Sequence, residues 1–411
     1  MSIPMLIPLE AARELFYDLL EVMPSEKVPL GEAGGRVLAE DIFAGDDIPP
    51  FNRSPLDGYA FRSADTTGAT AENPSWLQVL EEVPAGSWPR YPVSPGTATK
   101  ILTGAPVPAG ADAVIRFEET LLEGGKVGIK SPFLPDSNIC WAGEDIKKGE
   151  QGVHKGSVIT PGIAGILASQ GCAEPRVFRR PVVAIISTGD ELVGIDQPLS
   201  PGKIRDSNLY SLMAAVKEAG GIPCNLGTAA DDPKMIGEKL EQALEQADLV
   251  ITTGGASVGD YDLVKDTFQK IGAEMLFWKI GVRPGTAMVG AIRNGKVLLG
   301  LSGNPGAALI TFELLARPVI RHLGGWKQLY RLTVEGIMTE PFRKASPQRR
   351  ILRCIAFWKD DLWQVKLAGK QNPGIIQSFA SCNAMADIPA GTGPLKTGDR
   401  VKIIIQGGWS D

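Results

Sequence analysis

Residues 182–192 read VVAIISTGDEL, residues 248–262 read DLVITTGGASVGDYD, and residues 297–306 read VLLGLSGNPG. In each stretch a short apolar run leads directly into a glycine-rich loop. An unbroken apolar run of this length is typical of a parallel strand that is buried on both faces. In an open α/β sheet, the loops that follow such strands line the ligand crevice. The three stretches therefore predict a binding site at one edge of a parallel sheet.

Helical and extended segments alternate around these loops. The apolar spacing predicts strands over 182–186, 222–226, 248–252 and 297–301, and helices over 207–219, 233–246, 262–271 and 305–322. Such alternation is typical of a doubly wound, mostly parallel sheet. The sequence thus predicts a multidomain α/β protein whose α/β domain covers residues 181–325.

The segments on either side of this domain are rich in short β-like runs. Over 51–143, prolines and glycines separate runs such as 76–80 and 113–117. After residue 325 the pattern predicts short strands over 330–337, 351–357, 362–368 and 400–405. This punctuation leaves little room for helices. We expect a β-rich domain over 51–143 and a small C-terminal β domain over 326–411.

The composition excludes several classes of protein. The 411 residues carry a net charge of −5, which disfavours free nucleic acid as a partner. The five cysteines are scattered without a C-x-x-C pair, as is typical of proteins in a reducing cytosol. The N-terminal residues lack a signal-peptide pattern, and no apolar stretch is long enough to span a bilayer. We expect a cytoplasmic protein that binds neither membrane nor nucleic acid.

Charge is distributed unevenly along the chain. From Trp326 onward there are 13 Lys and Arg residues against 7 Asp and Glu residues. A basic C-terminal part beside acidic loops suits an anionic ligand held between them. A solvated basic face is the simpler explanation.

The three loops combine glycines with carboxylates. Glycines let the backbone approach a ligand closely, and their N–H groups can bind anionic oxygens. Carboxylate oxygens suit a hard cation such as magnesium. The loops therefore predict a phosphorylated ligand and a divalent metal. Simpler roles stay open, namely helix capping for Asp190 and Asp231 and a tight turn at Gly254–Gly255.

Motifs along the whole chain resemble one family. The α/β region contains four motifs, STGDEL (187–192), DSN (206–208), TTGGASVGDYD (252–262) and GNP (303–305). These four motifs are similar to those of the pterin-binding domain of molybdenum cofactor biosynthesis proteins. Three earlier motifs resemble the large molybdopterin molybdenumtransferases, and they are SPLDGYA (54–60), TGAPVP (103–108) and GED (143–145). The small adenylyltransferases of the same pathway lack these three.

The resemblance implies a division into four domains. Residues 1–50 and 144–180 are expected to form a discontinuous N-terminal α+β domain into which the β-rich domain 51–143 is inserted. Residues 181–325 are expected to bind molybdopterin, and 326–411 to form the C-terminal β domain. The resemblance further implies a homodimer.

The implied reaction is the insertion of molybdate into adenylylated molybdopterin, with Mg²⁺-dependent hydrolysis of the adenylate. Tungstate is an alternative oxyanion. The adenylyltransferase of the pathway and client molybdoenzymes are the implied protein partners.

The resemblance and the loop chemistry together assign three sets of residues. The metal ligands are expected among Asp190, Glu191, Asp206, Asp231, Asp260 and Asp262. The molybdopterin-binding residues are expected among Thr188, Gly189, Ser207, Asn208, Gly254, Gly255, Ser257, Gly259, Gly303, Asn304, Pro305, Arg349 and Ser378. The catalytic residues are expected to be Asp57, Thr103, Asp145, Lys279 and Arg283. Ordinary turn chemistry is the simpler role for Asp57, Thr103 and Asp145.

The chain departs from the family pattern at cationic positions. The family usually carries an arginine where this chain has Cys140, and a lysine where it has Thr286. Ser302 also replaces the proline that usually precedes the GNP motif. Loss of two positive charges is expected to weaken attraction for an oxyanion. The candidate replacements are Arg283, Arg349, Arg350, Arg353, Lys147 and Lys148.

Three functions compete on this evidence. The leading hypothesis is a molybdopterin molybdenumtransferase, or a paralogue specialised for tungstate. The second is a non-catalytic molybdopterin-binding or carrier protein that has lost the oxyanion cations. The third, which the N-terminal motifs disfavour, is a nucleotide-binding enzyme of another pathway.

Overall fold

A computed structural model describes residues 6–255 and 263–407 of the chain. Its largest unit contains a six-stranded sheet in the order β14–β11–β15–β19–β18–β16. These strands are β11 (Val182–Thr188), β14 (Ile222–Ala229), β15 (Leu249–Thr253), β16 (Glu274–Phe277), β18 (Val289–Arg293) and β19 (Lys296–Leu301). Strands β14, β11, β15 and β19 pair in parallel, whereas β18 is antiparallel to both of its neighbours.

The sheet is buried on both faces, as its unbroken apolar runs predict. Side chains alternate along a strand, so Val183 and Ile185 belong to one apolar cluster and Ala184 and Ile186 to another. The first cluster includes residues of α3 (Ser207–Ala219), α6 (Pro305–Thr311) and α7 (Arg317–Leu323), and the second those of α4 (Pro233–Gln246) and α5 (Leu263–Lys270). A π-helical stretch, Phe312–Ala316, joins α6 to α7. The predicted doubly wound α/β fold is confirmed.

A β-hairpin in this sheet was not predicted. Strands β18 and β19 are joined by Asn294 and Gly295, whose φ angles are 51° and 73°. A two-residue turn with both φ angles positive suits the right-handed twist of a hairpin, and Asn-Gly is its strongest sequence signal. Asn294–Gly295 carries this signal, but the hairpin was not predicted because the neighbouring apolar runs indicate parallel strands.

Helix α1 (Leu9–Leu19) packs on the α/β core. Its buried residues Leu9, Ala12 and Phe16 belong to the same apolar cluster as α7. The Phe16 ring meets that of Phe277 edge-on, with the ring centroids 6.0 Å apart. This packing places α1 with the α/β core and not with residues 144–180, so we propose that the discontinuous domain begins after it.

Residues 24–180 form two smaller units. The first holds the paired strands β1 (Ser25–Lys27) with β10 (Arg176–Phe178) and β2 (Ile42–Phe43) with β9 (Gln151–Val153), together with α2 (Pro161–Ser169). The second is a six-stranded sheet in the order β6–β3–β5–β4–β8–β7. Its strands are β3 (Gly58–Phe61), β4 (Ser75–Val83), β5 (Thr97–Ile101), β6 (Ala113–Arg116), β7 (Thr120–Glu123) and β8 (Lys126–Ile129). We call the second unit the inserted sheet.

The C-terminal part is a β domain, as the short strands predict, and its strands form a closed barrel. It consists of β20 (Thr333–Met338), β21 (Arg349–Lys359), β22 (Leu362–Leu367), β23 (Ala384–Ile388) and β24 (Arg400–Ile405). The long strand β21 pairs with both β22 and β23 and so closes the barrel. The short strand β17 (Val282–Arg283), from the α/β unit, extends the sheet by pairing in parallel with the start of β21.

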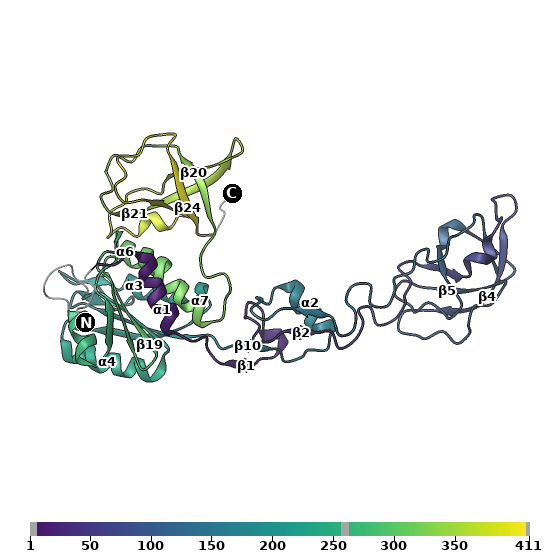
Figure 1. Cartoon of the computed structure of the whole chain (residues 1–411), viewed down its shortest axis with the longest axis horizontal. Helices are drawn as coiled ribbons and strands as arrows, with labels where there is room; N and C mark the ends of the chain where they lie inside the picture. Colours follow the sequence, from purple (N-terminus) through teal and green to yellow (C-terminus); the bar gives the residue numbers. More distant parts are fainter. Residues whose placement is uncertain (1–5, 256–262, 408–411) are drawn as a thin grey trace.

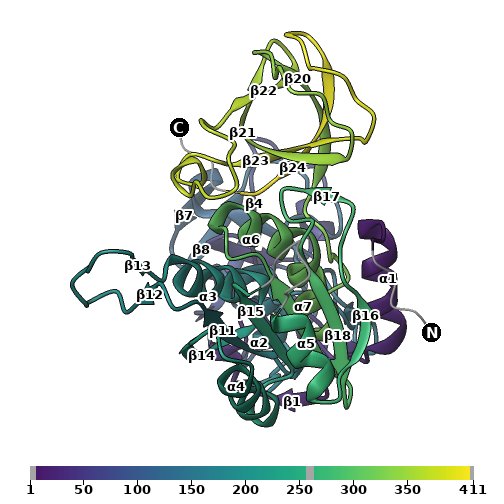
Figure 2. The same ribbon diagram turned by 90° about the vertical axis from the view of Figure 1, so that its left-hand side faces the viewer.

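The molecule is elongated. Figure 1 shows the barrel beside the α/β unit at one end and the inserted sheet, with β4 and β5, at the other. Figure 2 shows the barrel above α6 and β17. Within the described ranges, every helix is too short or too polar to cross a bilayer.

Candidate functional site

The carboxyl ends of three neighbouring strands meet at one edge of the α/β sheet, as predicted. Thr188 ends β11, Thr253 ends β15, and Gly303 lies just beyond β19. Asn208, in the first turn of α3, ties two of these ends together. Its Nδ2 donates to Thr253 Oγ1 at 2.7 Å and to the Gly303 carbonyl at 2.9 Å. Thr253 and Asn208 are buried, so these hydrogen bonds hold the ends of β15 and β19 in fixed positions.

Two glycines let the β15 loop pass close to β11. Gly254 and Gly255 have φ angles of 96° and 63°. A Cβ atom at Gly254 would clash with the Thr188 carbonyl, and one at Gly255 would lie 2.9 Å from Val264. Tight packing is therefore one reason for these glycines, alongside the expected approach of a ligand.

Several buried polar atoms at this edge have no hydrogen-bond partner among the described residues. They are Ser187 Oγ, Thr188 Oγ1, Thr252 Oγ1 and Asp206 Oδ2. Ser187, Thr188 and Asp206 line a small cavity of about 60 Å³ that Thr253, Gly303 and Pro305 also border. Buried polar groups in a folded protein are nearly always satisfied. Their clustering here marks a place where a polar ligand can supply the missing bonds.

Three expected metal ligands lie close together, and one of them, Glu191, borders this cavity. Burial raises the pKa of Asp231, and the negative charges of Asp190 and Glu191 raise it further. The Asp231 N–H also donates to Asp190 Oδ1 at 3.2 Å. The described residues contain no group of three side chains already at metal-ligating distance. The three carboxylates thus repel one another, and a cation beside them relieves this repulsion.

Helix capping involves different aspartates from those considered. Asp232, not Asp231, caps α4, because its side chain accepts from the N–H groups of Lys234 and Met235, each at 2.9 Å. Asp206 caps α3, since its Oδ1 accepts from the Leu209 N–H at 3.0 Å. The capping role considered for Asp190 and Asp231 is therefore wrong. Asp206 has one oxygen engaged in the cap and one, Oδ2, without a described partner.

Asp57 and Thr103 are brought together in the inserted sheet. Asp57 Oδ1 accepts from the Thr103 N–H at 2.7 Å and from its hydroxyl at 2.6 Å. These two bonds lower the pKa of Asp57. The Thr103 hydroxyl thus donates to Asp57 in this structure, and its expected role as a donor to an oxyanion stays a prediction. Asp145 lies in the neighbouring connection, where its N–H donates to the Ile48 carbonyl at 3.0 Å.

These residues are remote from the strand-end site of the same chain. Figure 1 places the inserted sheet and β19 at opposite ends of the molecule. A single chain therefore does not unite Asp57 and Thr103 with Thr188 and Asn208.

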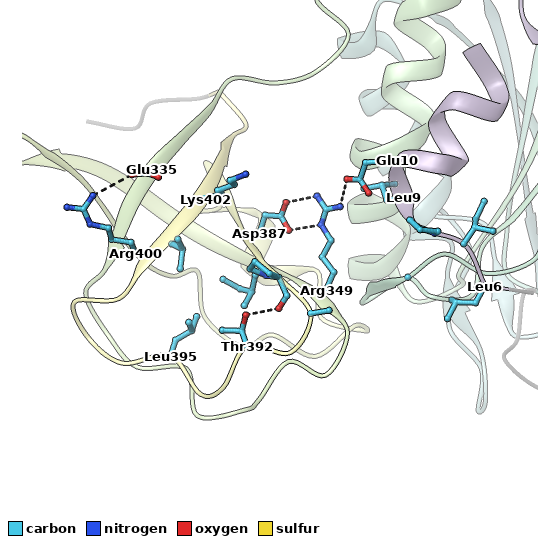
Figure 3. A pocket seen from close by; sticks show the side chains of 17 residues that line it. Leu6, Leu9, Glu10, Glu335, Arg349, Asp387, Thr392, Leu395, Arg400 and Lys402 are labelled. Carbon is cyan, nitrogen blue, oxygen red and sulfur yellow. Dashed lines mark hydrogen bonds and ion pairs between the residues drawn. The ribbon is translucent and has the colours of Figure 1, made fainter. Parts of the chain in front are cut away.

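Arg349 is committed to an ion-pair network. Its Nε and Nη2 bind the two oxygens of Asp387 at 2.8 and 2.6 Å, and its Nη1 binds Glu10. Figure 3 shows this arginine joining the barrel to α1 across a cavity of about 860 Å³. The Asp387 hydrogen bonds raise the pKa of Arg349. These ion pairs give Arg349 a structural role, and its expected contact with molybdopterin stays a prediction. Ser378 is buried in the barrel.

The basic candidates of the α/β unit lie in and just before β17. Lys279 Nζ lies over the Trp278 ring, 4.2 Å from its centroid. Arg283 is in β17 and exposed. Thr286, found in place of the usual lysine, donates its hydroxyl proton to the Val282 carbonyl at 2.8 Å. Cys140 lies between Arg53 and Glu144, and its pKa is raised by burial and by Glu144.

Two residues of the site were not predicted from the sequence, and four predicted residues lie outside the described part of the chain. Ser187 and Thr253 were not predicted, although a hydroxyl side chain at the end of a buried strand is a usable signal. The expected residues Ser257, Gly259, Asp260 and Asp262 lie outside the described residues.

Together these features define a multidomain α/β protein with a polar ligand site at the carboxyl edge of its sheet. Residues 7–171 match the MoeA N-terminal region (domains I and II), 184–322 a probable molybdopterin-binding domain, and 335–405 the MoeA C-terminal region (domain IV). The chain therefore belongs to the MoeA family.

Individual relatives agree with this assignment over nearly the full length. A molybdopterin molybdenumtransferase from Staphylococcus epidermidis is 39% identical over 396 residues, which are 96% of this chain and 94% of the relative. One from Bacillus subtilis is 36% identical over 403 residues, or 97% and 94% of the two chains. The solved structure of a molybdopterin biosynthesis MoeA protein from Pyrococcus horikoshii matches 97% of this chain and 100% of its own at 32% identity, with a TM-score of 0.83.

Proposed function

We propose that this chain is a molybdopterin molybdenumtransferase that inserts molybdate into adenylylated molybdopterin and hydrolyses the adenylate. The observation that carries the proposal is the convergence of the ends of β11, β15 and β19 on a cavity lined by unsatisfied polar atoms. Membership of the MoeA family over nearly the whole chain supports the same reaction.

In this proposal the strand-end loops bind the substrate. The hydroxyls of Ser187 and Thr188 and the backbone near Gly254 and Gly303 offer hydrogen bonds to the pterin and phosphate groups. The bonds from Asn208 keep these loops fixed, so little order is lost on binding. Arg283 is exposed in β17, where its positive charge can attract the anionic parts of the substrates.

The carboxylates of Asp190, Glu191 and Asp231 fit Mg²⁺. Burial raises the pKa of Asp231, and the nearby charges of Asp190 and Glu191 raise it further, which supports this placement. Their lack of preformed ligating geometry suits an ion that keeps several of its waters. When bound, Mg²⁺ offsets the negative charge that develops at the phosphoanhydride. Asp206, whose Oδ2 has no partner among the described residues, borders the same cavity as Glu191.

We further propose that the active enzyme is a cytoplasmic homodimer. Because Asp57 and Thr103 lie far from the strand-end site of their own chain, a second copy is needed if they are to reach it. The adenylyltransferase that precedes this reaction and client molybdoenzymes that follow it are the proposed protein partners.

The proposal is tested by supplying purified protein with adenylylated molybdopterin, Mg²⁺, and either molybdate or tungstate. We expect release of AMP together with molybdenum-loaded cofactor. AMP release only with tungstate would identify the specialised paralogue. Tight binding of the substrate without AMP release, whatever the oxyanion, would identify a carrier protein and overturn the proposal.

A further inference from the structure

A cavity of about 450 Å³ lies on the inserted sheet, and aromatic and proline side chains form much of its lining. The ring of Phe51 meets that of Trp88 edge-on, with the ring centroids 5.8 Å apart. Tyr91 borders the same cavity, and the side chains of Trp88 and Tyr91 are both exposed. Exposed aromatic side chains can bind flat rings by stacking. We call this cavity the aromatic pocket.

Hydrogen bonds hold the walls of the aromatic pocket in place. Glu81, in β4, accepts through one oxygen from the N–H groups of Arg90 and Tyr91, at 2.8 and 2.9 Å. Elsewhere in the lining, Asn52 Oδ1 accepts from the Ala142 N–H at 2.8 Å. The pocket is therefore formed before a ligand arrives, which lowers the entropy cost of binding.

The aromatic pocket lies beside Asp57 and Thr103. Three segments of its lining belong to, or lie within two residues of, the motifs that resemble the large molybdenumtransferases, and they are 51–52, 106–107 and 142. The first two segments run side by side, because the Val107 N–H donates to the Asn52 carbonyl at 2.9 Å. Thr103 precedes Pro106 by three residues, so its Cα lies no more than about 11 Å from this wall of the pocket. A substrate at Asp57 and Thr103 can therefore reach the pocket.

The cavity at the strand ends can hold only a small part of the proposed substrate. Its volume is about 60 Å³, which is the space of roughly two water molecules. Adenylylated molybdopterin carries two ring systems, the pterin and the adenine. Residues 184–322 match a probable molybdopterin-binding domain, which favours the α/β unit for the pterin end. The adenine end then needs a second site.

We propose that the aromatic pocket binds a flat heterocycle of the adenylylated substrate, and we expect this ring to be the adenine. The inference rests on the proposed function for its choice of ligand. Adenine and pterin share the chemistry that the pocket recognises, since both are flat rings that stack on aromatic side chains. Arg90 also borders the pocket, and its positive charge suits the phosphate next to the adenine. In the proposed dimer, the strand-end site of one chain holds the molybdopterin end and the aromatic pocket of its partner holds the adenine.

The pocket is tested by calorimetric titration of the full-length chain with AMP and, separately, with a free pterin. We expect Trp88→Ala to weaken AMP binding roughly tenfold, and Trp88→Phe, which keeps an aromatic ring, to retain most of the affinity. Trp358→Ala is the matched control, because Trp358 is also exposed and also meets another ring, that of Trp363, edge-on at 5.5 Å. This control should bind both ligands as the wild type does.

Each outcome of the titration decides a point. Weakened binding of the pterin in place of AMP would support the pocket and assign it to the pterin. Equal binding of both ligands by the wild type and Trp88→Ala would overturn the pocket, as would a wild type that binds neither.

The kinetics of AMP release give a second readout. Trp88→Ala is expected to raise the KM for adenylylated molybdopterin roughly tenfold and to leave kcat within about twofold, because stacking away from the reacting atoms holds substrate and transition state alike. An active wild type whose KM is unchanged in Trp88→Ala overturns the pocket and leaves the proposed reaction intact. A wild type that binds AMP through Trp88 but fails to insert molybdate leaves the pocket intact and overturns the reaction.

Light scattering on the same samples separates ligand binding from contact between copies of the chain. The proposal expects wild type and Trp88→Ala to have the same oligomeric state. If the wild type is dimeric and Trp88→Ala is monomeric at the same concentration, Trp88 belongs to a subunit interface and the pocket is overturned.

Discussion

At the scale of single residues, a glycine in a strand-end loop can serve ligand binding or close packing, and the sequence pattern does not distinguish the two roles. Gly254 and Gly303 were predicted as ligand-binding positions, and both lie at the strand-end site. Gly254, however, is already required by the fold, because its φ angle is 96° and Thr188 leaves no room for a side chain. A glycine-rich loop therefore reports close packing as well as binding.

Replacement of Gly254 separates these two reasons. Gly254→Ala is expected to lower the free energy of unfolding by more than about 2 kcal/mol, because strain and a clash act together. Gly202→Ala is the control, since Gly202 also has a positive φ, 80°, but open space around it. Urea denaturation of both variants measures the difference. Equal losses would show that the contact with Thr188 is easily relaxed.

The raised pKa of Asp231 predicts a specific pH dependence. A carboxyl group whose pKa is higher in the folded than in the unfolded state makes the protein less stable as pH rises between the two values. Asp231→Asn is therefore expected to raise the melting temperature at pH 7 in Mg²⁺-free buffer and to reduce the further stabilisation by Mg²⁺. At a pH below the unfolded value the two proteins should converge. Lower stability of the variant at pH 7 would contradict a cost from the burial of the Asp231 carboxylate and its repulsion by Asp190 and Glu191.

Direct removal of the two loop carboxylates tests the metal assignment. Asp190→Ala with Glu191→Ala is expected to abolish Mg²⁺-dependent release of AMP and to leave the melting temperature within a few degrees of wild type, because both side chains are exposed. The assay follows AMP release across a Mg²⁺ titration. Full activity of this double variant would place the metal elsewhere.

At the scale of elements, unbroken apolar runs were sufficient to predict the parallel strands. Helices α3 and α4 begin and end at the predicted residues, 207–219 and 233–246. The hairpin of β18 and β19 was missed because an Asn-Gly turn was outweighed by the expectation of parallel strands. Strand β23 was missed because three of its five residues are alanine or aspartate, which favour strands weakly.

Much of the site could be predicted because it follows from this strand order. Thr188, Asn208 and Gly303 come together simply because parallel strands end at the same edge. The pairing of Arg283 with Arg350 depends on the register between strand β17 of the α/β unit and strand β21 of the barrel. Pairing of Arg349 with Glu10 likewise joins residues 339 positions apart. Such long-range contacts leave no local pattern in a sequence.

The cap of α3 offers a test that separates structure from chemistry. Asp206→Ala is expected to lower the free energy of unfolding by about 1 kcal/mol, whereas Asp206→Asn keeps the cap and costs little. Both variants remove the carboxylate, so both should weaken the Mg²⁺ dependence of AMP release if Asp206 Oδ2 serves the metal. Unfolding curves and the Mg²⁺ titration are measured on the same samples. Unchanged Mg²⁺ dependence in Asp206→Asn would restrict this residue to capping.

At the scale of the whole molecule, the separation of the two motif groups makes dimerisation testable by complementation. An Asp57→Ala chain and an Asp190→Ala/Glu191→Ala chain are each expected to be inactive. After subunit exchange of equal amounts, half of the dimers are mixed and each mixed dimer has one intact site. Activity should therefore recover to about one quarter of the wild-type value. No recovery after exchange has been verified would place each complete site within one chain.

Helix α1 has a consequence for the order in which the protein is made. Its apolar residues Leu9 and Phe16 leave the ribosome about 300 residues before α7, with which they pack. At synthesis rates of roughly 5–20 residues per second, that interval lasts about 15–60 seconds. Throughout it, α1 has an exposed apolar face, and the α/β core cannot close until α7 emerges. In a newborn chain, α1 therefore reaches its full set of apolar contacts only after α7 has been made.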